Sequence, residues 1–262
     1  IDASLDRNTD NVDWLVKLAY DIGDDSMIYA SASTGNKSGN FSGQNGTAEE
    51  REFDDEETTS YELGVKSTLL DSRLRVNAAA FYTQVDDYQA QQQLPAGIGT
   101  FVTNQGELEV AGLDLQVEAV PLPTLTLSGG LLYMDKYEIT DGPRDGQDLP
   151  YTAEFSGNLA ATLVFPLADG GLFARADYIF MDDHITNTAD ASLLQDKDED
   201  DREVVNARVG WRNDHWNFSI WGKNLTDDEY ASQTLVTQLF SGMDAYFLAP
   251  PRTYGATLRY DF

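Results

Sequence analysis

Apolar and polar residues alternate along most of the chain with a period of two. Because successive side chains of a β-strand point to opposite faces, this pattern predicts strands with one apolar and one polar face. In the C-terminal strand the apolar positions are Tyr254, Ala256, Leu258, Tyr260 and Phe262. We expect about eleven strands, near residues 12–22, 26–35, 59–69, 73–86, 106–119, 125–135, 152–165, 171–181, 203–213, 215–225 and 251–262.

The two faces of these strands favour a membrane sheet over a soluble sandwich. The apolar faces carry Tyr or Trp near the strand ends and small aliphatic residues in the middle, as a lipid-facing band between aromatic girdles does. The opposite faces carry charges in mid-strand, such as Arg75 and Arg208, which a water-filled lumen accepts and a dry core does not. The strands of a soluble β-sandwich also alternate between apolar and polar residues. The lengths of the connections between strands provide a further distinction between the two folds.

Short and long connections alternate along the chain. Outer-membrane barrels have this rhythm because their periplasmic turns are tight and their outer loops are long. The sequence therefore predicts an all-β fold, a transmembrane antiparallel up-and-down β-barrel whose last strand ends in the periplasm. Short turns are expected near 23–25, 70–72, 120–124, 166–170 and 213–214, and long connections near 36–58, 87–105, 136–151, 182–202 and 226–250.

The strand count predicts that the chain is part of a larger barrel. The first and last strands run in the same direction, so the count is odd, whereas a complete single-chain bacterial barrel has an even number of strands. We therefore expect residues 1–262 to be a C-terminal portion, with upstream strands absent. No secretion signal is visible at Ile1, which agrees with this expectation.

Composition narrows the possible functions. The chain carries 45 acidic and 17 basic side chains, and its formal net charge of -28 argues against a nucleic-acid partner. Mean hydropathy is -0.40, and no run approaches the roughly 18 apolar residues of a membrane helix. There is no cysteine, and His184 and His215 are too far apart in sequence to suggest a metal cluster or a catalytic set. We expect no enzymatic activity.

Several stretches resemble the C-terminal barrel of TonB-dependent receptors. Each is short, but they follow the family's order over nearly the whole chain. They are SMIYASASTGNKSGNFSG (Ser26–Gly43), YELGVKSTLLDSRLRVNAAAFY (Tyr61–Tyr82), NQGELEVAGLDLQVEAVP (Asn104–Pro121), GKNLTDDEY (Gly222–Tyr230) and PRTYGATLRYDF (Pro251–Phe262).

The resemblance implies a barrel of about 22 strands, of which this chain holds the second half, without the plug domain and TonB box of the family. It implies an outer-membrane receptor that imports a scarce ligand with energy from the TonB complex, which it contacts through the missing plug. Ferric siderophores are the commonest ligands, with cobalamin, haem and oligosaccharides as alternatives. A passive substrate-specific porin and a structural or adhesive role are the other functional hypotheses.

The C-terminal residues also resemble the signal that the barrel-assembly machinery reads, through Tyr254, Leu258, Tyr260 and Phe262. The alternative is an ordinary edge strand that ends in Phe. The remaining partners that the resemblance implies are outer-membrane lipids and lipopolysaccharide.

Two sets of side chains are candidate contacts of the receptor. Aromatic residues on the long connections would form a ligand-contacting rim, or alternatively pack among themselves. Basic residues on the polar faces would pair with the plug or with inward acids, or would simply be solvated. The aromatic set is Phe101, Tyr137, Phe240, Tyr246 and Phe247, and the basic set is Arg175, Arg208, Arg212 and Arg259, with Lys66 and Lys223.

Two acidic runs, Glu49–Glu57 and Asp196–Asp201, are candidates for calcium binding, because hard cations prefer clustered carboxylates. Asp196, Asp198 and Asp200 have alternating spacing, but the Gly and Glu of an EF-hand loop are missing. The alternative is a solvated, self-repelling loop. A weak, loop-bound Ca²⁺ is therefore the only cofactor that the sequence suggests.

Overall fold

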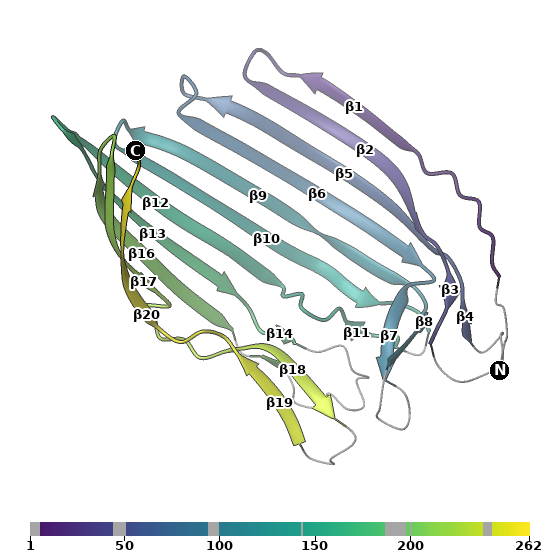
Figure 1. Ribbon diagram of the computed structural model, residues 1–262. Helices are drawn as coiled ribbons and strands as arrows, with labels where there is room; N and C mark the ends of the chain where they lie inside the picture. The colour runs from purple at the N-terminus through teal and green to yellow at the C-terminus, as the bar shows by residue number, and fades with distance from the viewer. Residues whose placement is uncertain are drawn as a thin grey trace.

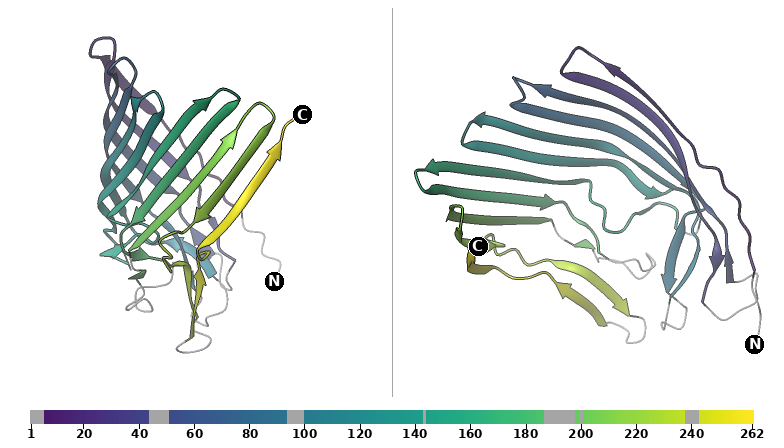
Figure 2. Two further views of the ribbon diagram at one scale, coloured as in Figure 1. Left: turned by 90° about the vertical axis from the view of Figure 1, so that its left-hand side faces the viewer. Right: turned by 45° about the horizontal axis from the view of Figure 1, so that its top comes forward.

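The computed structural model describes residues 6–43, 51–93, 100–142, 144–186, 198–199, 201–237 and 243–262. Eleven long antiparallel strands form one curved wall, in which each strand pairs with the next along the chain (Figures 1 and 2). They are β1 (Leu15–Asp21), β2 (Ser26–Lys37), β5 (Glu56–Leu69), β6 (Leu74–Asp86), β9 (Leu108–Leu122), β10 (Leu125–Ile139), β12 (Phe155–Leu167), β13 (Gly170–Met181), β16 (Arg202–Arg212), β17 (Trp216–Lys223) and β20 (Thr253–Tyr260). The predicted all-β up-and-down architecture is confirmed.

Four of the five long connections contain short strands that pair with each other, which the sequence did not predict. These antiparallel pairs lie together at one end of the wall, opposite the tight turns and the C-terminus (Figure 1). These strands are β3 (Asn40–Phe41) with β4 (Glu52–Phe53), β7 (Gln89–Gln93) with β8 (Thr100–Asn104), β14 (His184–Ile185) with β15 (Asp198–Glu199) and β18 (Ala231–Thr237) with β19 (Met243–Leu248). A further short strand, β11 (Gln147–Asp148), pairs with the outer end of β10.

The strand register collects the apolar positions on a single face. One cross-strand row reads Leu63, Ala80, Leu113, Tyr133 and Phe155 from β5 to β12. Leu63 is 63% exposed and Leu113 is 52% exposed, and the apolar face continues across the rest of the wall. Such an apolar surface is unfavourable in water and favourable in hydrocarbon, so this face contacts lipid.

The opposite face is polar. A row on this face passes through Asn77, Gln116, Gly130 and Asn158, from β6 to β12. Since the apolar face contacts lipid, this face lines the water-filled lumen. Within the described part of the chain, no helix is long and apolar enough to cross a membrane.

A small apolar cluster lies at the outer end of the wall. Val85, Leu108 and Ile139 are buried there, at the ends of β6, β9 and β10, and Tyr88 and Leu149 from the adjoining connections pack against them. This cluster anchors two of the long connections to the strands that carry them.

Five aromatic rings on four strands lie over glycines of the neighbouring strand. A Cβ atom at any of these glycines would overlap the ring, because each ring packs directly on the partner's backbone. Such aromatic–glycine pairs fill the gap that glycine leaves in a sheet and help to fix its register. The direct cross-strand pairs are Tyr29 with Gly64, Phe81 with Gly112, Phe180 with Gly157, Phe173 with Gly210 and Trp221 with Gly255.

We expect Leu159→Arg, on the apolar face, to destabilise the barrel in a bilayer by about 2–4 kcal/mol, because the charge would enter hydrocarbon. The neighbouring substitution Asn158→Arg introduces the same charge on the polar face and should cost much less. Urea unfolding in liposomes, followed by the heat-modified mobility of the folded barrel, measures the difference. Equal losses for the two variants would show that the faces are assigned wrongly.

We expect Gly255→Val to destabilise the barrel by about 1–3 kcal/mol, because the new side chain would displace the Trp221 ring and break its hydrogen bond to Thr257. Near-ultraviolet circular dichroism and thermal unfolding report both effects. Gly35→Ala is the matched control, since the nearest atom to its new Cβ would be the Thr58 Cβ at 4.0 Å. A Gly255→Val variant as stable as the wild type would contradict a packing role for this pair.

Candidate functional site

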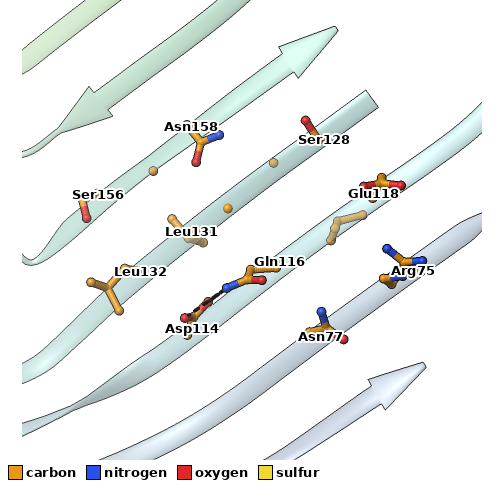
Figure 3. Close-up of a pocket in the computed structure, with 14 residues that line it drawn as sticks. Arg75, Asn77, Asp114, Gln116, Glu118, Ser128, Leu131, Leu132, Ser156 and Asn158 are labelled. Carbon is orange, nitrogen blue, oxygen red and sulfur yellow. Dashed lines mark hydrogen bonds between the residues drawn. The ribbon is translucent and has the colours of Figure 1, made fainter. Parts of the chain in front are cut away.

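The polar face is hollowed into a groove of about 500 Å³ across β6, β9, β10 and β12 (Figure 3). Gly130 lies at its centre, between Gln116 and Asn158 on the adjacent strands. Because Gly130 has no side chain, the wall is thin at this point and the longer polar groups surround a depression. The polar side chains that line it are Arg75, Asn77, Asp114, Gln116, Glu118, Ser128, Ser156 and Asn158.

The groove offers hydrogen-bond donors and acceptors in nearly equal measure. Three carboxamides and two hydroxyls can serve in either role, while Asp114 and Glu118 accept and Arg75 donates. Arg75 and Glu118 are direct cross-strand partners, and the Gln116 amide donates weakly to Asp114 at 3.4 Å. Such a surface suits polar groups of a molecule or polypeptide segment in the lumen, and its side chains include neither histidine nor cysteine.

All four predicted lumenal arginines lie on the polar face. Arg175 donates to Asp177 and to Thr162, and Arg259 donates to Asp261, so each pairs with an acid two residues further along the chain. Arg208 donates to the Ser219 hydroxyl across the β16–β17 pair at 2.9 Å. Arg212 lies 5.9 Å from the Phe173 ring centroid. A role for these residues in plug contact stays a prediction.

The five long connections are hydrogen-bonded to one another in series. Each contact joins a connection to the next around the rim, and the Thr186 and Thr234 side chains in the last of them are almost fully buried. In order, Val102 N–H donates to Ser42 Oγ (3.0 Å), Thr140 N–H to Glu107 O (2.9 Å), Tyr151 N–H to Ile185 O (2.7 Å) and Thr234 N–H to Thr186 O (3.0 Å).

Arg7 ties the segment before β1 to the first long connection. Its guanidinium lies 2.6 Å from Glu52 and 3.1 Å from Asp55, and Asp55 also accepts the Gly39 N–H at 2.6 Å. The hydrogen bond from Gly39 N–H is the largest influence on the pKa of Asp55 and lowers it. The hydrogen bond and charge of Arg7 lower this pKa further, while desolvation raises it. Part of the acidic run Glu49–Glu57 is therefore neutralised by a cation of the chain itself.

The predicted rim aromatics are spread over several outer elements. Phe101 lies on β8 and Tyr137 near the outer end of β10, while Tyr246 and Phe247 are adjacent on β19. The last two are about half exposed, at 54% and 52%, and successive positions on a strand face opposite ways. Phe240 lies outside the described residues. No ring contact joins these aromatics within the described part of the chain.

The predicted calcium candidates fall mostly outside the structure. Asp196 and Asp200 are not among the described residues, and of Asp198 only the backbone pairing in β15 is described. Among the residues that are described, no group of three His, Cys, Asp or Glu side chains could hold a metal ion. Calcium binding at this loop stays a prediction.

The C-terminal residues form an aromatic cluster at the tight-turn end. Tyr260 packs against Trp216 with ring centroids 4.7 Å apart and against Phe262 at 5.0 Å. Tyr254 and Leu258 lie on the same apolar face and are 68% and 66% exposed. The cluster has the composition of an interfacial girdle. Recognition of Tyr254, Leu258, Tyr260 and Phe262 by the assembly machinery stays a prediction.

Three features were missed from the sequence. The strands β18 and β19 have a signal in their Thr, Val, Tyr and Phe content, which a search of the long connections for short hairpins would have found. The Arg7 ion cluster joins residues that are 45 to 48 positions apart, and the aromatic–glycine pairs depend on register. Neither leaves a local pattern.

A curved antiparallel wall with one apolar face, one polar face, tight turns at one end and long hairpins at the other defines the outer-membrane β-barrels of Gram-negative bacteria. Residues 2–225 match the family model described as TonB-dependent receptor-like, beta-barrel. The chain belongs to this family.

Relatives and solved structures of this family resemble the chain over most of its length. The catecholate siderophore receptor Fiu of Escherichia coli (strain UTI89 / UPEC) is 25% identical over 96% of this chain and 33% of its own. The ferric-pyoverdine receptor PbuA of Pseudomonas sp. (strain M114) is 25% identical over 78% of this chain and 24% of its own. The ferric yersiniabactin uptake receptor FyuA of Yersinia pestis superposes with a TM-score of 0.79 at 19% identity, over 95% of this chain and 37% of that one. The chain thus spans a third or less of the curated relatives named here.

We expect acid to loosen the first long connection. The pKa of Asp55 is lower in the folded state than in the unfolded state. The stabilisation of this connection by ionised Asp55 is therefore fully present above the unfolded pKa of about 3.9, and it is lost as the pH falls through the folded-state pKa. Hydrogen exchange of the Gly39 amide, corrected for its intrinsic rate, should lose protection below that range. Asp55→Asn should leave this amide weakly protected at every pH, and unchanged wild-type protection down to pH ~2 would contradict the assignment.

Proposed function

We propose that the chain is part of the barrel of an active-transport receptor, which takes up a ferric siderophore into the periplasm with energy from TonB. The family match over residues 2–225 carries this proposal. The ligand class is supported by the relatives, since Fiu is a catecholate siderophore receptor and PbuA a ferric-pyoverdine receptor.

The geometry is compatible with capture and passage of a ligand. The outer connections form a linked rim, from which Tyr246 and Phe247 present exposed aromatic surface for contact with an organic ligand. Behind the rim, the polar groove around Gly130 supplies hydrogen-bonding groups along the lumen. These parts bind and guide a molecule, and we propose that the receptor does no chemistry on it.

The longer protein that this function requires has further parts. In the sheet, β1 and β20 are the two terminal strands of the path and do not pair with each other. We propose that additional strands close the wall between them, to about 22 in all, and that an upstream plug domain connects the ligand to the TonB complex. The assembly machinery, membrane lipids and lipopolysaccharide are the remaining proposed partners.

Uptake of radioactive iron tests the function. The full-length gene is expressed in an iron-starved Gram-negative host without its own siderophore receptors, and ferric catecholate, pyoverdine and yersiniabactin are supplied one at a time. We expect at least one to accumulate, and accumulation to disappear when TonB is deleted. Uptake that persists without TonB indicates a passive channel, and no uptake by a correctly inserted receptor contradicts the siderophore assignment.

The same assay tests the rim. The double substitution Tyr246→Ala and Phe247→Ala should reduce uptake about tenfold, because two exposed rings that contact the ligand would be lost. Leu248→Ala is the matched control, since Leu248 is 69% exposed on the same strand and should tolerate truncation. Equal uptake by the double variant and the wild type would place the ligand elsewhere on the rim.

A further inference from the structure

Two arginines share one aromatic ring on the lumenal face near the tight-turn end. Phe173 lies over Gly210, and the guanidinium carbons of Arg208 and Arg212 lie 5.5 Å and 5.9 Å from its ring centroid. Cation–π contacts of this kind hold a guanidinium in place without neutralising it. The ring therefore contacts two positive charges on one face of β16, on either side of Gly210.

A third arginine faces this pair. Arg175 on β13 is the direct cross-strand partner of Arg208, and like charges in this position destabilise a sheet. Arg175 is compensated by Asp177 at 2.5 Å. Arg208 is instead held by Ser219, whose side chain is fully buried and accepts its Nε–H at 2.9 Å.

Neither Arg208 nor Arg212 forms an ion pair with any carboxylate in the described part of the chain. This is unexpected on composition, because acidic side chains outnumber basic ones by 45 to 17. An acid at a paired position beside Arg208 would offset its repulsion with Arg175, and among the paired positions of β13, β16 and β17 next to Arg208 only Asp177 is acidic, which already pairs with Arg175. The local charge is therefore positive in a strongly acidic protein.

We propose that Arg208 and Arg212, with Arg175 at the edge, form an oxyanion-binding site on the lumenal wall. A guanidinium offers two parallel N–H donors, which match the two oxygens of a carboxylate or the oxygens of a phosphate. Phe173 and Ser219 restrict the rotamers of the arginine side chains before a ligand binds. The loss of side-chain conformational entropy on binding is therefore smaller. The preferred ligand is a carboxylate, which comes either from a polypeptide segment inside the lumen or from a free anion in transit.

The site differs from the groove around Gly130 in both chemistry and place. That groove is lined mainly by neutral amides and hydroxyls on β6 to β12, whereas the arginine site lies on β13 and β16. Phe173 and Arg212 are close to the tight turns that end their strands, so a ligand meets this site at the periplasmic end of the lumen. This site rests on the proposed function only in needing a water-filled lumen, and it does not depend on the transported ligand being a ferric siderophore.

Calorimetric titration of the detergent-solubilised full-length protein with citrate, at low salt, tests the site. If a free anion is the ligand, the wild type should bind citrate, and the double substitution Arg208→Gln and Arg212→Gln should weaken binding at least tenfold. Replacement of both by Lys keeps the charges but removes the forked donors, and should also weaken binding. Arg252→Gln is the matched control, because it removes one positive charge in an outer connection, where Arg252 pairs with Asp227.

If a polypeptide carboxylate already occupies the site, the wild type should not bind citrate. Hydrogen exchange then distinguishes this case, since the double Gln variant should deprotect a segment upstream of residue 1 and the Arg252→Gln variant should not. Heat-modified mobility checks that each variant is folded. A wild type that binds no citrate, together with unchanged exchange in both the Gln and Lys double variants, overturns the proposal. A failure of siderophore uptake alone would leave these binding results intact.

Discussion

In hydrocarbon a backbone amide has no water to bond, so each N–H and C=O of a strand that crosses a bilayer must pair with a neighbouring strand. The ladder meets this condition for the strands between β1 and β20, while β1 and β20 are each paired on one edge. Since side chains then alternate strictly between the two faces, one set of positions must be apolar and the other is free to be polar. The lumen, the groove around Gly130 and the arginine site are possible because side chains on the lumenal face do not contact lipid and can be polar.

The same constraint explains how much of the fold could be predicted. Period-two alternation marked all eleven long strands, and the final strand, expected at 251–262, is found at Thr253–Tyr260. The sequence did not predict the hairpins of the long connections, because their strands are short and no bilayer imposes alternation on them. It placed Arg208 and Arg212 on the lumenal face, but their shared contact with Phe173 depends on the register between β13 and β16, which alternation leaves open.

Charge is distributed unevenly in this protein. Most acids lie on the outer connections and strand ends, where Arg7 and Lys37 compensate some of them, while uncompensated guanidinium groups are held inside the lumen. The net charge of -28 therefore describes the outer surface better than the interior. Net charge alone is therefore a poor guide to what such a wall can bind.

The hydrogen bonds that join the outer connections in series also affect the thermodynamics of capture. A rim of independent loops would lose much conformational entropy when a ligand orders it, and affinity would fall accordingly. Here the bonds from Ser42 to Thr234 restrict the connections before any ligand arrives. Part of the entropy loss that ligand binding would require has therefore already occurred on folding, and in the proposed receptor this would favour binding of a dilute ligand.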